Sequence, residues 1–394
     1  MAEPSKKAKI GVILLTLFIN MLGFGIVIPV LPLYAQDFGA TEMQIGLLFA
    51  SYSLCQFLFS PIIGKLSDKI GRRPVLIVSV IGTAAGFFIM GAANTLALLF
   101  VGRILDGVSG ASIATCQAYL ADVTTREERG KTMGLMGATF GLGFIFGPAL
   151  GGLASAAYGS QAPFYIAGVL AVLNLFLVIR FVTESLTPEL RAKASATKTE
   201  VPKENRATYY RVVLINFLAI CGFAIMTTIF ALYLKERFEY GAKEAGYLFA
   251  FIGVIAVLMQ GGVLRRLLKN EGKEIPVAVS GAIILAISLA AMPFVGGLGA
   301  LLFAVAGLAI GNSLISPTVS ALASLCAGAD SQGATLGVYQ SAGSLGRAIG
   351  PFLAGWLLTV GTTGTYASTA LYVSAGIIVL TLIVLLTVRP PKDA

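Results

Sequence analysis

The chain has 394 residues, of which 57% are hydrophobic and only 12% are charged, and its mean hydropathy is +0.87. A soluble core does not need so large an apolar fraction, so the composition excludes an ordinary soluble domain. The net charge of +9 would favour a nucleic-acid partner in a soluble protein, but the placement of the basic residues along this chain predicts a membrane protein that binds no nucleic acid.

Twelve apolar stretches follow one another, each close to the roughly 20 residues that a helix needs to cross a bilayer. Backbone groups in hydrocarbon must be satisfied within the segment, and the stretches lack the two-residue alternation of barrel strands, so each is predicted to be a helix. The predicted spans are 10–34, 43–64, 75–93, 95–120, 132–157, 163–183, 208–234, 244–264, 275–295, 297–322, 332–358 and 365–388. The predicted fold is an all-α polytopic membrane protein.

Basic residues concentrate on alternate connections between the spans. They include Lys6, Lys7 and Lys9 before the first span, Lys65, Lys69, Arg72 and Arg73 after the second, and Arg126, Arg129 and Lys131 after the fourth. Cytoplasmic loops are enriched in Lys and Arg, so both termini and the long middle connection are predicted to lie in the cytoplasm of a multi-pass protein.

The sequence divides into two halves that repeat each other. Residues 184–207 are rich in Pro, Lys, Glu, Thr and Ala and lose the apolar pattern, so they are predicted to link six-helix halves at 1–183 and 208–394. The residues Gly130, Thr132, Gly134, Leu142, Gly143, Gly147, Pro148, Leu150 and Gly152 recur 203 positions later. Two pseudo-symmetric halves with a site near the midplane are the geometry of rocking-type alternating access.

Residue types that usually carry enzyme chemistry are scarce. The chain has no histidine, and its four cysteines stand singly without metal-ligand spacing. No metal site is predicted, and the cysteines are expected to pack as small apolar residues. An enzyme is not expected, although a membrane-embedded enzyme is kept as a remote alternative. No phosphate-binding loop is found, so no cofactor is expected.

A charged segment separates the second and third spans and reads Gly64-Lys65-Leu66-Ser67-Asp68-Lys69-Ile70-Gly71-Arg72-Arg73. Its glycines predict a tight cytoplasmic turn, because glycine permits close approach and positive φ. Asp68 is then expected to face the N-terminus of the eleventh helix, near Ser331 and Gln332, where free N–H groups favour an anion. Alternatively, the cations of this segment only fix the topology.

The fourth span contains two charges, Arg103 and Asp106, at positions i and i+3. Each costs about 2.5–3.5 kcal/mol at the bilayer centre, and the spacing places both on one helical face. Gly107 and Gly110 beside them would admit a neighbouring helix. We expect Asp106 to cycle a proton that Arg103 tunes; the alternative is a permanent salt bridge.

Small residues recur on two further spans. The fifth contains Gly143, Gly147, Pro148, Gly151 and Gly152, and the eleventh contains Gly343, Gly346, Gly350 and Pro351. Such faces let helix backbones touch, so they predict either helix packing or a role in sealing the cavity.

With these motifs the chain resembles the major facilitator superfamily, and within it the twelve-helix drug:proton antiporters such as tetracycline and fluoroquinolone efflux pumps. The resemblance rests on the segment 64–73, the run 103–107, the run 143–152 and the Pro29-Val30-Leu31-Pro32 sequence that closes the first span. It implies a proton-driven exporter of amphipathic small molecules in the cell inner membrane, with multidrug efflux and antibiotic resistance as consequences. We expect the chain to act as a monomer. It also implies that Gly64, Asp68, Gly71, Arg72 and Arg73 form a cytoplasmic latch.

The chain departs from that family's pattern on the first span, where Asn20 stands at a place that is acidic in many relatives. Asn20 cannot titrate. Coupling would then depend on Asp106, with Asp37 or Asp68 as further candidates, unless Asn20 replaces a native aspartate in an engineered chain.

The substrate cavity is expected to be mostly apolar with a few placed polar groups. Its candidates are polar or aromatic residues within the spans: Asn20, Gln56, Gln117, Asn216, Phe230, Asn312, Tyr339, Gln340 and Arg347. Each could instead serve an interhelical hydrogen bond or simple packing. Arg347 either faces the cavity, which would suit a lipid or lysolipid headgroup, or reaches the cytoplasmic surface. A lipid transporter or an uptake carrier on the same fold is therefore the alternative to drug export.

Overall fold

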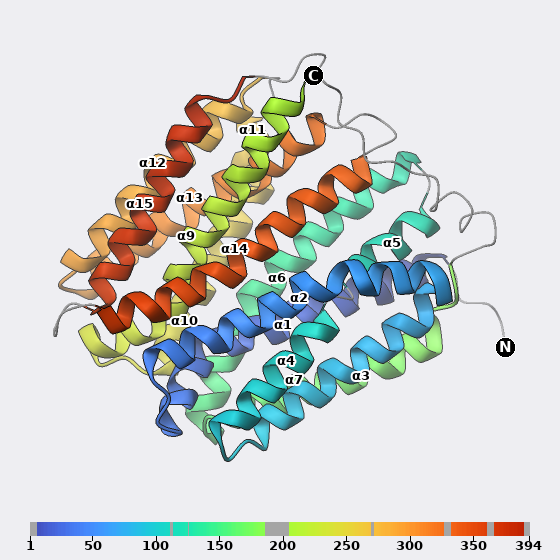
Figure 1. The fold of residues 1–394 in the computed structure, drawn as a ribbon, viewed down its shortest axis with the longest axis horizontal. Coiled ribbons are helices and arrows are strands. Elements are labelled where there is room, and N and C mark those ends of the chain that lie inside the picture. The colour runs from blue at the N-terminus through green and yellow to red at the C-terminus, as the bar shows by residue number, and fades with distance from the viewer. Residues whose placement is uncertain are drawn as a thin grey trace. The chain divides into compact units, whose positions relative to one another are not determined.

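The computed structural model describes residues 6–110, 113–124, 126–185, 205–268, 272–326, 332–360 and 366–389. Within these ranges every regular element is a helix, and no strand is found (Figure 1). The helices are α1 (Lys6–Asp37), α2 (Glu42–Ile70), α3 (Arg72–Gly91), α4 (Leu96–Gly110), α5 (Ile113–Val123), α6 (Arg126–Tyr158), α7 (Ala162–Phe181), α9 (Arg206–Phe238), α10 (Ala242–Leu258), α11 (Leu264–Leu267), α12 (Glu274–Ala291), α13 (Leu298–Leu325), α14 (Gln332–Val360) and α15 (Tyr366–Leu386). A π-helical turn at Met259–Val263 joins α10 to α11.

Each predicted span coincides in large part with one or more of these helices, and the prediction of an all-helical membrane protein is confirmed for the described residues. Nine of the described helical stretches are long and apolar enough to cross a membrane. The full count of twelve spans stays a prediction. Several helices extend beyond the predicted ends, because a helix continues into the polar region where its last turns are solvated.

The predicted turn over residues 64–73 is wrong in extent. Helix α2 continues to Ile70 and α3 begins at Arg72, so the turn consists of Gly71 alone. Gly71 has φ 113°, a conformation that residues with a side chain avoid. Gly64 lies inside α2, and a Cβ there would meet no atom within 4 Å. Among the described residues, therefore, nothing approaches Gly64 closely.

The chain groups into two compact units, which are described separately. Unit 1 comprises Met1–Thr41, Ser51–Ala196 and Arg237–Ala250, and unit 2 comprises Glu42–Ala50, Thr197–Glu236 and Phe251–Ala394. The boundary after Ala196 falls inside the predicted linker, but each unit also takes one short segment from the opposite sequence half. The division into two six-helix halves at 1–183 and 208–394, joined by a linker at 184–207, therefore stays a prediction that rests on the sequence repeat.

In unit 1, helix α1 packs on α6 through glycines. A Cβ on Gly25 would lie 2.9 Å from Pro148 Cδ and 3.1 Å from Gly147 Cα, and a Cβ on Gly143 would lie 2.5 Å from Met21 Cβ. Lipid tails are as apolar as leucine, so such close backbone packing is a main source of attraction between helices in a bilayer. The glycines of the fifth span thus lie at a helix contact, as the packing interpretation predicts.

Unit 2 repeats this arrangement between α9 and α14. A Cβ on Gly346 would lie 2.7 Å from the carbonyl oxygen of Phe217, and one on Gly350 would lie 2.7 Å from that of Cys221. The sequence repeat therefore corresponds to a repeated helix contact, one in each unit.

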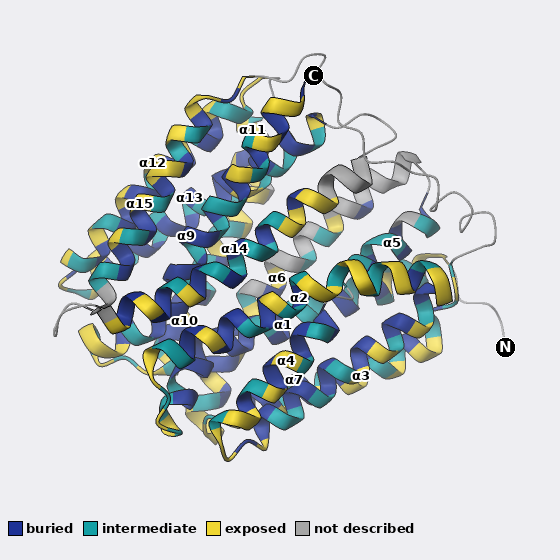
Figure 2. Ribbon diagram, in the orientation of Figure 1, coloured by how far each residue is buried: buried dark blue, intermediate teal, exposed yellow. Residues whose placement is uncertain are grey.

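Large apolar side chains also cover outer helix faces. Val78 on α3 is 68% exposed, Ile287 on α12 is 64% exposed and Phe303 on α13 is 84% exposed, and exposed and buried positions alternate along the helices in Figure 2. In water such surface would be unfavourable, but it suits contact with lipid tails.

We expect Gly147→Ala to lower the midpoint of thermal unfolding in detergent, because its Cβ would lie 2.6 Å from the carbonyl oxygen of Leu22. Overpacking of this kind costs about 1–3 kcal/mol. The control is Gly376→Ala on α15. Its Cβ would meet no described atom within 4 Å, and replacing glycine by alanine within a helix should stabilise the helix by about 1 kcal/mol. Equal midpoints for the two variants would contradict the packing interpretation.

Candidate functional site

Helix α4 buries an ion pair within its apolar sequence. Arg103 has 0% of its surface exposed and Asp106 has 2%, and Arg103 Nη1 lies 3.7 Å from Asp106 Oδ2. This distance allows ionic attraction but is long for a hydrogen bond. The predicted placement of both charges on one helical face is confirmed, and the role of the pair remains to be argued from its surroundings.

An aromatic ring of α2 covers the guanidinium group of Arg103. The guanidinium carbon lies 4.5 Å from the centroid of the Tyr52 ring, which is within the range of a cation–π interaction and is worth about 2 kcal/mol when desolvated. Gly107 brings α2 and α4 together here, because a Cβ on it would lie 2.5 Å from the carbonyl oxygen of Tyr52. Arg103 is thus stabilised as a cation by both Asp106 and Tyr52.

A hydroxyl group of α3 meets the other member of the pair. The side chain of Thr83 hydrogen-bonds the Asp106 carboxyl group. Helices α3 and α4 touch at this level, since a Cβ on Gly86 would lie 2.9 Å from the carbonyl oxygen of Gly102 and 3.1 Å from the backbone nitrogen of Asp106. A buried carboxylate is costly unless it is paired or takes up a proton, so this site can serve either as a fixed pair or as a proton carrier.

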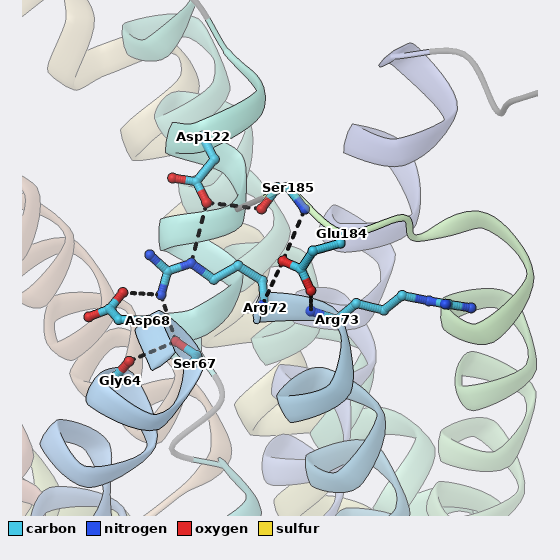
Figure 3. A network of polar contacts seen from close by, with 8 residues as sticks. All are labelled: Gly64, Ser67, Asp68, Arg72, Arg73, Asp122, Glu184 and Ser185. Atoms are coloured by element: carbon cyan, nitrogen blue, oxygen red, sulfur yellow. Dashed lines mark hydrogen bonds and ion pairs between the residues drawn. The ribbon is translucent and has the colours of Figure 1, made fainter. Parts of the chain in front are cut away.

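A second polar group lies where α2 meets α3, and Figure 3 shows it with Arg72 at its centre. The guanidinium of Arg72 forms ion pairs with Asp68 and with Asp122, the latter at 3.3 Å from Nε to Oδ2. Its Nη1 also donates a hydrogen bond of 2.6 Å to Ser67 Oγ. One cation therefore joins α2 and α3 to the end of α5.

Glu184, which follows α7, binds the first turn of α3. Its Oε1 accepts a 2.8 Å hydrogen bond from the backbone N–H of Arg72, and its Oε2 accepts one of 3.2 Å from that of Arg73 (Figure 3). A carboxylate at a helix N-terminus satisfies free N–H groups and the helix dipole. A Cβ on Gly71 would collide with Glu184 Oε2, so both the backbone angle and the space at this turn require glycine.

Sequence reasoning missed Glu184, Asp122 and Ser185. The available signal was charge: Asp122 and Glu184 are acids that follow the fourth and sixth spans, on the side of the chain that carries the basic clusters. Ser185 donates a 2.9 Å hydrogen bond to Asp122 Oδ2, and a serine gives no comparable signal.

Asp122 lies beyond the membrane-spanning stretch Leu96–Leu120. Burial raises the pKa of its carboxyl group above the ordinary value, and the hydrogen bond from Ser185 and the charge of Arg72 offset this only in part. Asp122 therefore takes up a proton more readily than an exposed aspartate does.

The predicted partner of Asp68 cannot be compared with the structure, because Ser331 lies outside the described residues. The Asp68 side chain is 45% exposed and is held by Arg72. Its contact with the eleventh helix, and the latch role of the segment, stay predictions.

Of the predicted cavity residues, Asn20, Gln56 and Gln117 belong to unit 1. The side-chain nitrogen of Gln56 donates to the carbonyl oxygen of Gly110 at 3.3 Å, so Gln56 joins α2 to the end of α4. Asn20 and Gln117 are half-buried, and Asn20 lines a small cavity.

In unit 2, three of the predicted residues gather where α9 meets α14. Asn216 Nδ2 donates a 2.8 Å hydrogen bond to the carbonyl oxygen of Tyr339. A Cβ on Gly343 would lie 3.0 Å from Asn216 Nδ2 and 3.8 Å from Arg347 Nη1. The half-buried Arg347 also donates to Ser344 Oγ at 2.9 Å, and neither of its two predicted orientations is decided by these contacts.

The remaining candidates of unit 2 are dispersed. Phe230 is buried, Asn312 is half-buried and Gln340 is exposed. A substrate cavity that draws on both units stays a prediction. In the described part of the chain, no group of three His, Cys, Asp or Glu residues could hold a metal ion.

Comparisons with known proteins agree with this architecture. The family model described as Major Facilitator Superfamily matches residues 13–351 and 272–394. The chain is 32% identical over 347 residues to the class B tetracycline resistance protein of Escherichia coli, covering 85% of this chain and 84% of that protein. It is 28% identical to the quinolone resistance protein NorA of Staphylococcus aureus, covering 89% and 90%. The crystal structure of the human organic anion transporter MFSD10 superposes with a TM-score of 0.76 at 21% identity, covering 97% of this chain and all of that one.

We expect Gly71→Ala to lower the unfolding midpoint in detergent more than Gly39→Ala does. Both glycines have positive φ, 113° and 71°, and such strain costs about 1–3 kcal/mol. Only Gly71 adds a collision, with Glu184, whereas a Cβ on Gly39 would meet no atom within 4 Å. The cost of Gly71→Ala should shrink when Glu184→Ala is also present, and strict additivity of the two changes would contradict the contact.

A pH-dependent prediction follows from Asp122. A group whose folded-state pKa is raised contributes stability below its unfolded pKa, about 3.9 for aspartate, and loses that contribution as the pH rises through the folded value. We therefore expect Asp122→Asn to become more stable relative to the parent chain as the pH rises from about 4 to neutrality. The measurement is the difference in unfolding midpoint across this range, with Asp37→Asn as control. A difference that falls with pH would contradict the raised pKa.

Proposed function

This chain belongs to the Major Facilitator Superfamily, and we propose that it is a secondary active transporter that exports amphipathic small molecules in exchange for protons. The observation that carries the proposal is the buried Arg103–Asp106 pair, with Asp106 2% exposed and 3.7 Å from its cation. An ionisable group inside a membrane helix is costly, so its presence favours a functional role.

The exported substrate class follows from the relatives. Two proteins that match most of this chain are named for resistance to tetracycline and to quinolones, and both names denote amphipathic drugs. Drug pockets are mostly apolar with few polar groups, and the predicted cavity candidates would supply the few polar and aromatic groups among otherwise apolar helices.

Asp106 can couple protons because its surroundings favour both of its charge states. Arg103 favours the ionised carboxylate, whereas burial favours the protonated acid. The Thr83 hydroxyl group hydrogen-bonds the carboxyl group and, as both donor and acceptor, can do so in either state. A shift of α3 or α2 against α4 would change this balance, so proton uptake and release are linked to helix movement.

The proton gradient is a sufficient energy source. One charge that moves across a potential of 100 mV releases about 2.3 kcal/mol, which supports roughly a fiftyfold substrate gradient. We propose that the chain works without a cofactor, as a monomer, with both termini in the cytoplasm.

A second candidate substrate is a lipid with an anionic or zwitterionic headgroup. Arg347 favours it, because it places a half-buried guanidinium on α14, 2.9 Å from Ser344 Oγ, and a guanidinium group recognises phosphate and carboxylate well. An uptake carrier on the same fold is distinguished by the direction of substrate movement.

We expect Asp106→Asn to abolish the stimulation of dye export by an imposed pH gradient, because asparagine cannot titrate. The measurement is transport of a lipophilic cationic dye in liposomes with and without the gradient. Asp106→Glu, which keeps a titrating carboxyl, is the matched control and should retain part of the stimulation. Coupling that persists in Asp106→Asn would contradict the proposal. Coupling that appears only in Asn20→Asp would assign the titrating site to α1.

A further inference from the structure

A small cavity lies among α1, α3 and α7 in unit 1. Its volume is about 10 Å³, and its polar lining consists of Thr16, Asn20, Thr83 and Asn174. Three of these four side chains are buried: Thr16 and Asn174 are each 2% exposed and Thr83 is 6% exposed. Neutral polar side chains of membrane helices hydrogen-bond across helix contacts, and here four of them surround one cavity.

The size and the lining of the cavity suit one water molecule. A water molecule needs roughly 10–15 Å³ measured in this way and two to four polar partners, whereas an apolar cavity of the same size stays dry. The four polar side chains meet this requirement. A larger guest, such as an organic substrate, does not fit the volume.

Hydrogen bonds in this region leave groups that a water molecule would satisfy. The Thr16 hydroxyl lies 2.9 Å from the carbonyl oxygen of Val12 and 3.0 Å from Asn174 Oδ1, but it has a single proton to donate. The Asn174 side chain is nearly fully buried and lines the cavity, and its amide N–H groups are donors that a water molecule can accept from. Buried polar groups gain from such a partner, so this lining favours a bound water.

Thr83 connects the cavity to the ion pair. Its side chain lines the cavity and also hydrogen-bonds the Asp106 carboxyl group. A water molecule in the cavity would therefore be separated from that carboxyl by one hydroxyl group, which can accept a proton on one side and donate its own on the other.

We infer that this cavity binds one water molecule and that this water exchanges protons with Asp106 through the Thr83 hydroxyl. On release, the Asp106 O–H proton moves to Thr83 Oγ1 while the Thr83 proton moves to the water, which leaves as hydronium. Uptake is the reverse, so no oxidant or other reactant is needed. The water site stands on the geometry alone, whereas the proton exchange rests on the proposed function.

The water site is tested by radiolytic labelling of the reconstituted protein in water enriched in oxygen-18. Radicals formed from bound water oxidise adjacent side chains. Val80, which is 5% exposed and lines the cavity, should be labelled several-fold more than Leu76 one turn away on α3, which is fully buried. Equal labelling of Val80 and Leu76 would overturn the water site.

A plugging variant sharpens this test. Ala171 lines the cavity and is 1% exposed, so Ala171→Val should fill it and reduce Val80 labelling at least threefold. Ala167→Val is the matched control, since Ala167 is 2% exposed on the same helix, one turn away, and does not line the cavity. If a thermal scan shows that Ala171→Val does not fold, proton transfer is measured in Thr83→Val instead. The water site is then still decided by the labelling of Val80 in the parent chain.

Proton exchange is tested by gradient-driven dye transport in the same liposomes. Ala171→Val and Thr83→Val should slow it at least threefold, with Ala167→Val unchanged. Reduced labelling together with undiminished proton-driven transport would overturn the exchange. If transport stays coupled in Asp106→Asn, the proposed function fails at Asp106 while the labelling of Val80 still decides whether the cavity holds water.

Discussion

The charged pair of α4 is the constraint on which the surrounding structure depends. Hydrocarbon cannot solvate Arg103 or Asp106, so each must find compensation from the helices around it. Arg103 finds it in Asp106 and in the ring of Tyr52, and Asp106 finds it in Arg103 and in the Thr83 hydroxyl. These partners come from α2 and α3, so α4 cannot shift without changing the electrostatic balance of the pair. Coupling between a proton and a helix movement needs this property.

Glycine contacts determine how closely those partners approach. Gly86 and Gly107 have no side chains, so α3 and α2 can pack closely against α4. Glycines allow the same close packing between α1 and α6 in unit 1 and between α9 and α14 in unit 2. Attraction between helices in a bilayer arises mainly from such packing. The same contacts that hold the helices therefore also position the functional side chains, and a single added methyl group at one of them is expected to disturb both.

The α2–α3 turn is stabilised by a different set of contacts. Arg72 pairs with two carboxylates, while Glu184 binds the backbone of α3 and leaves no room for a side chain at Gly71. This end of the structure lies nearer to water, where exposed ion pairs contribute little. Its strength comes from the buried Arg72 and the half-buried Asp122, and from the helix capping by Glu184. The raised pKa of Asp122 makes this group responsive to acid, unlike an exposed pair.

The helical membrane class, the approximate position of the spans, the internal repeat and the placement of Arg103 and Asp106 on one helical face can all be predicted from the sequence alone. These properties depend on composition and on spacing along one helix, which geometry fixes locally. Other features become visible only once the chain is folded. Helix α2 runs on to Ile70, and Tyr52 covers Arg103. Thr83 joins Asp106 to a cavity lined by Asn20 and Asn174, and Glu184 and Asp122 lie at the α2–α3 turn. These partners are distant in sequence, and which helix faces meet depends on how all the side chains pack together.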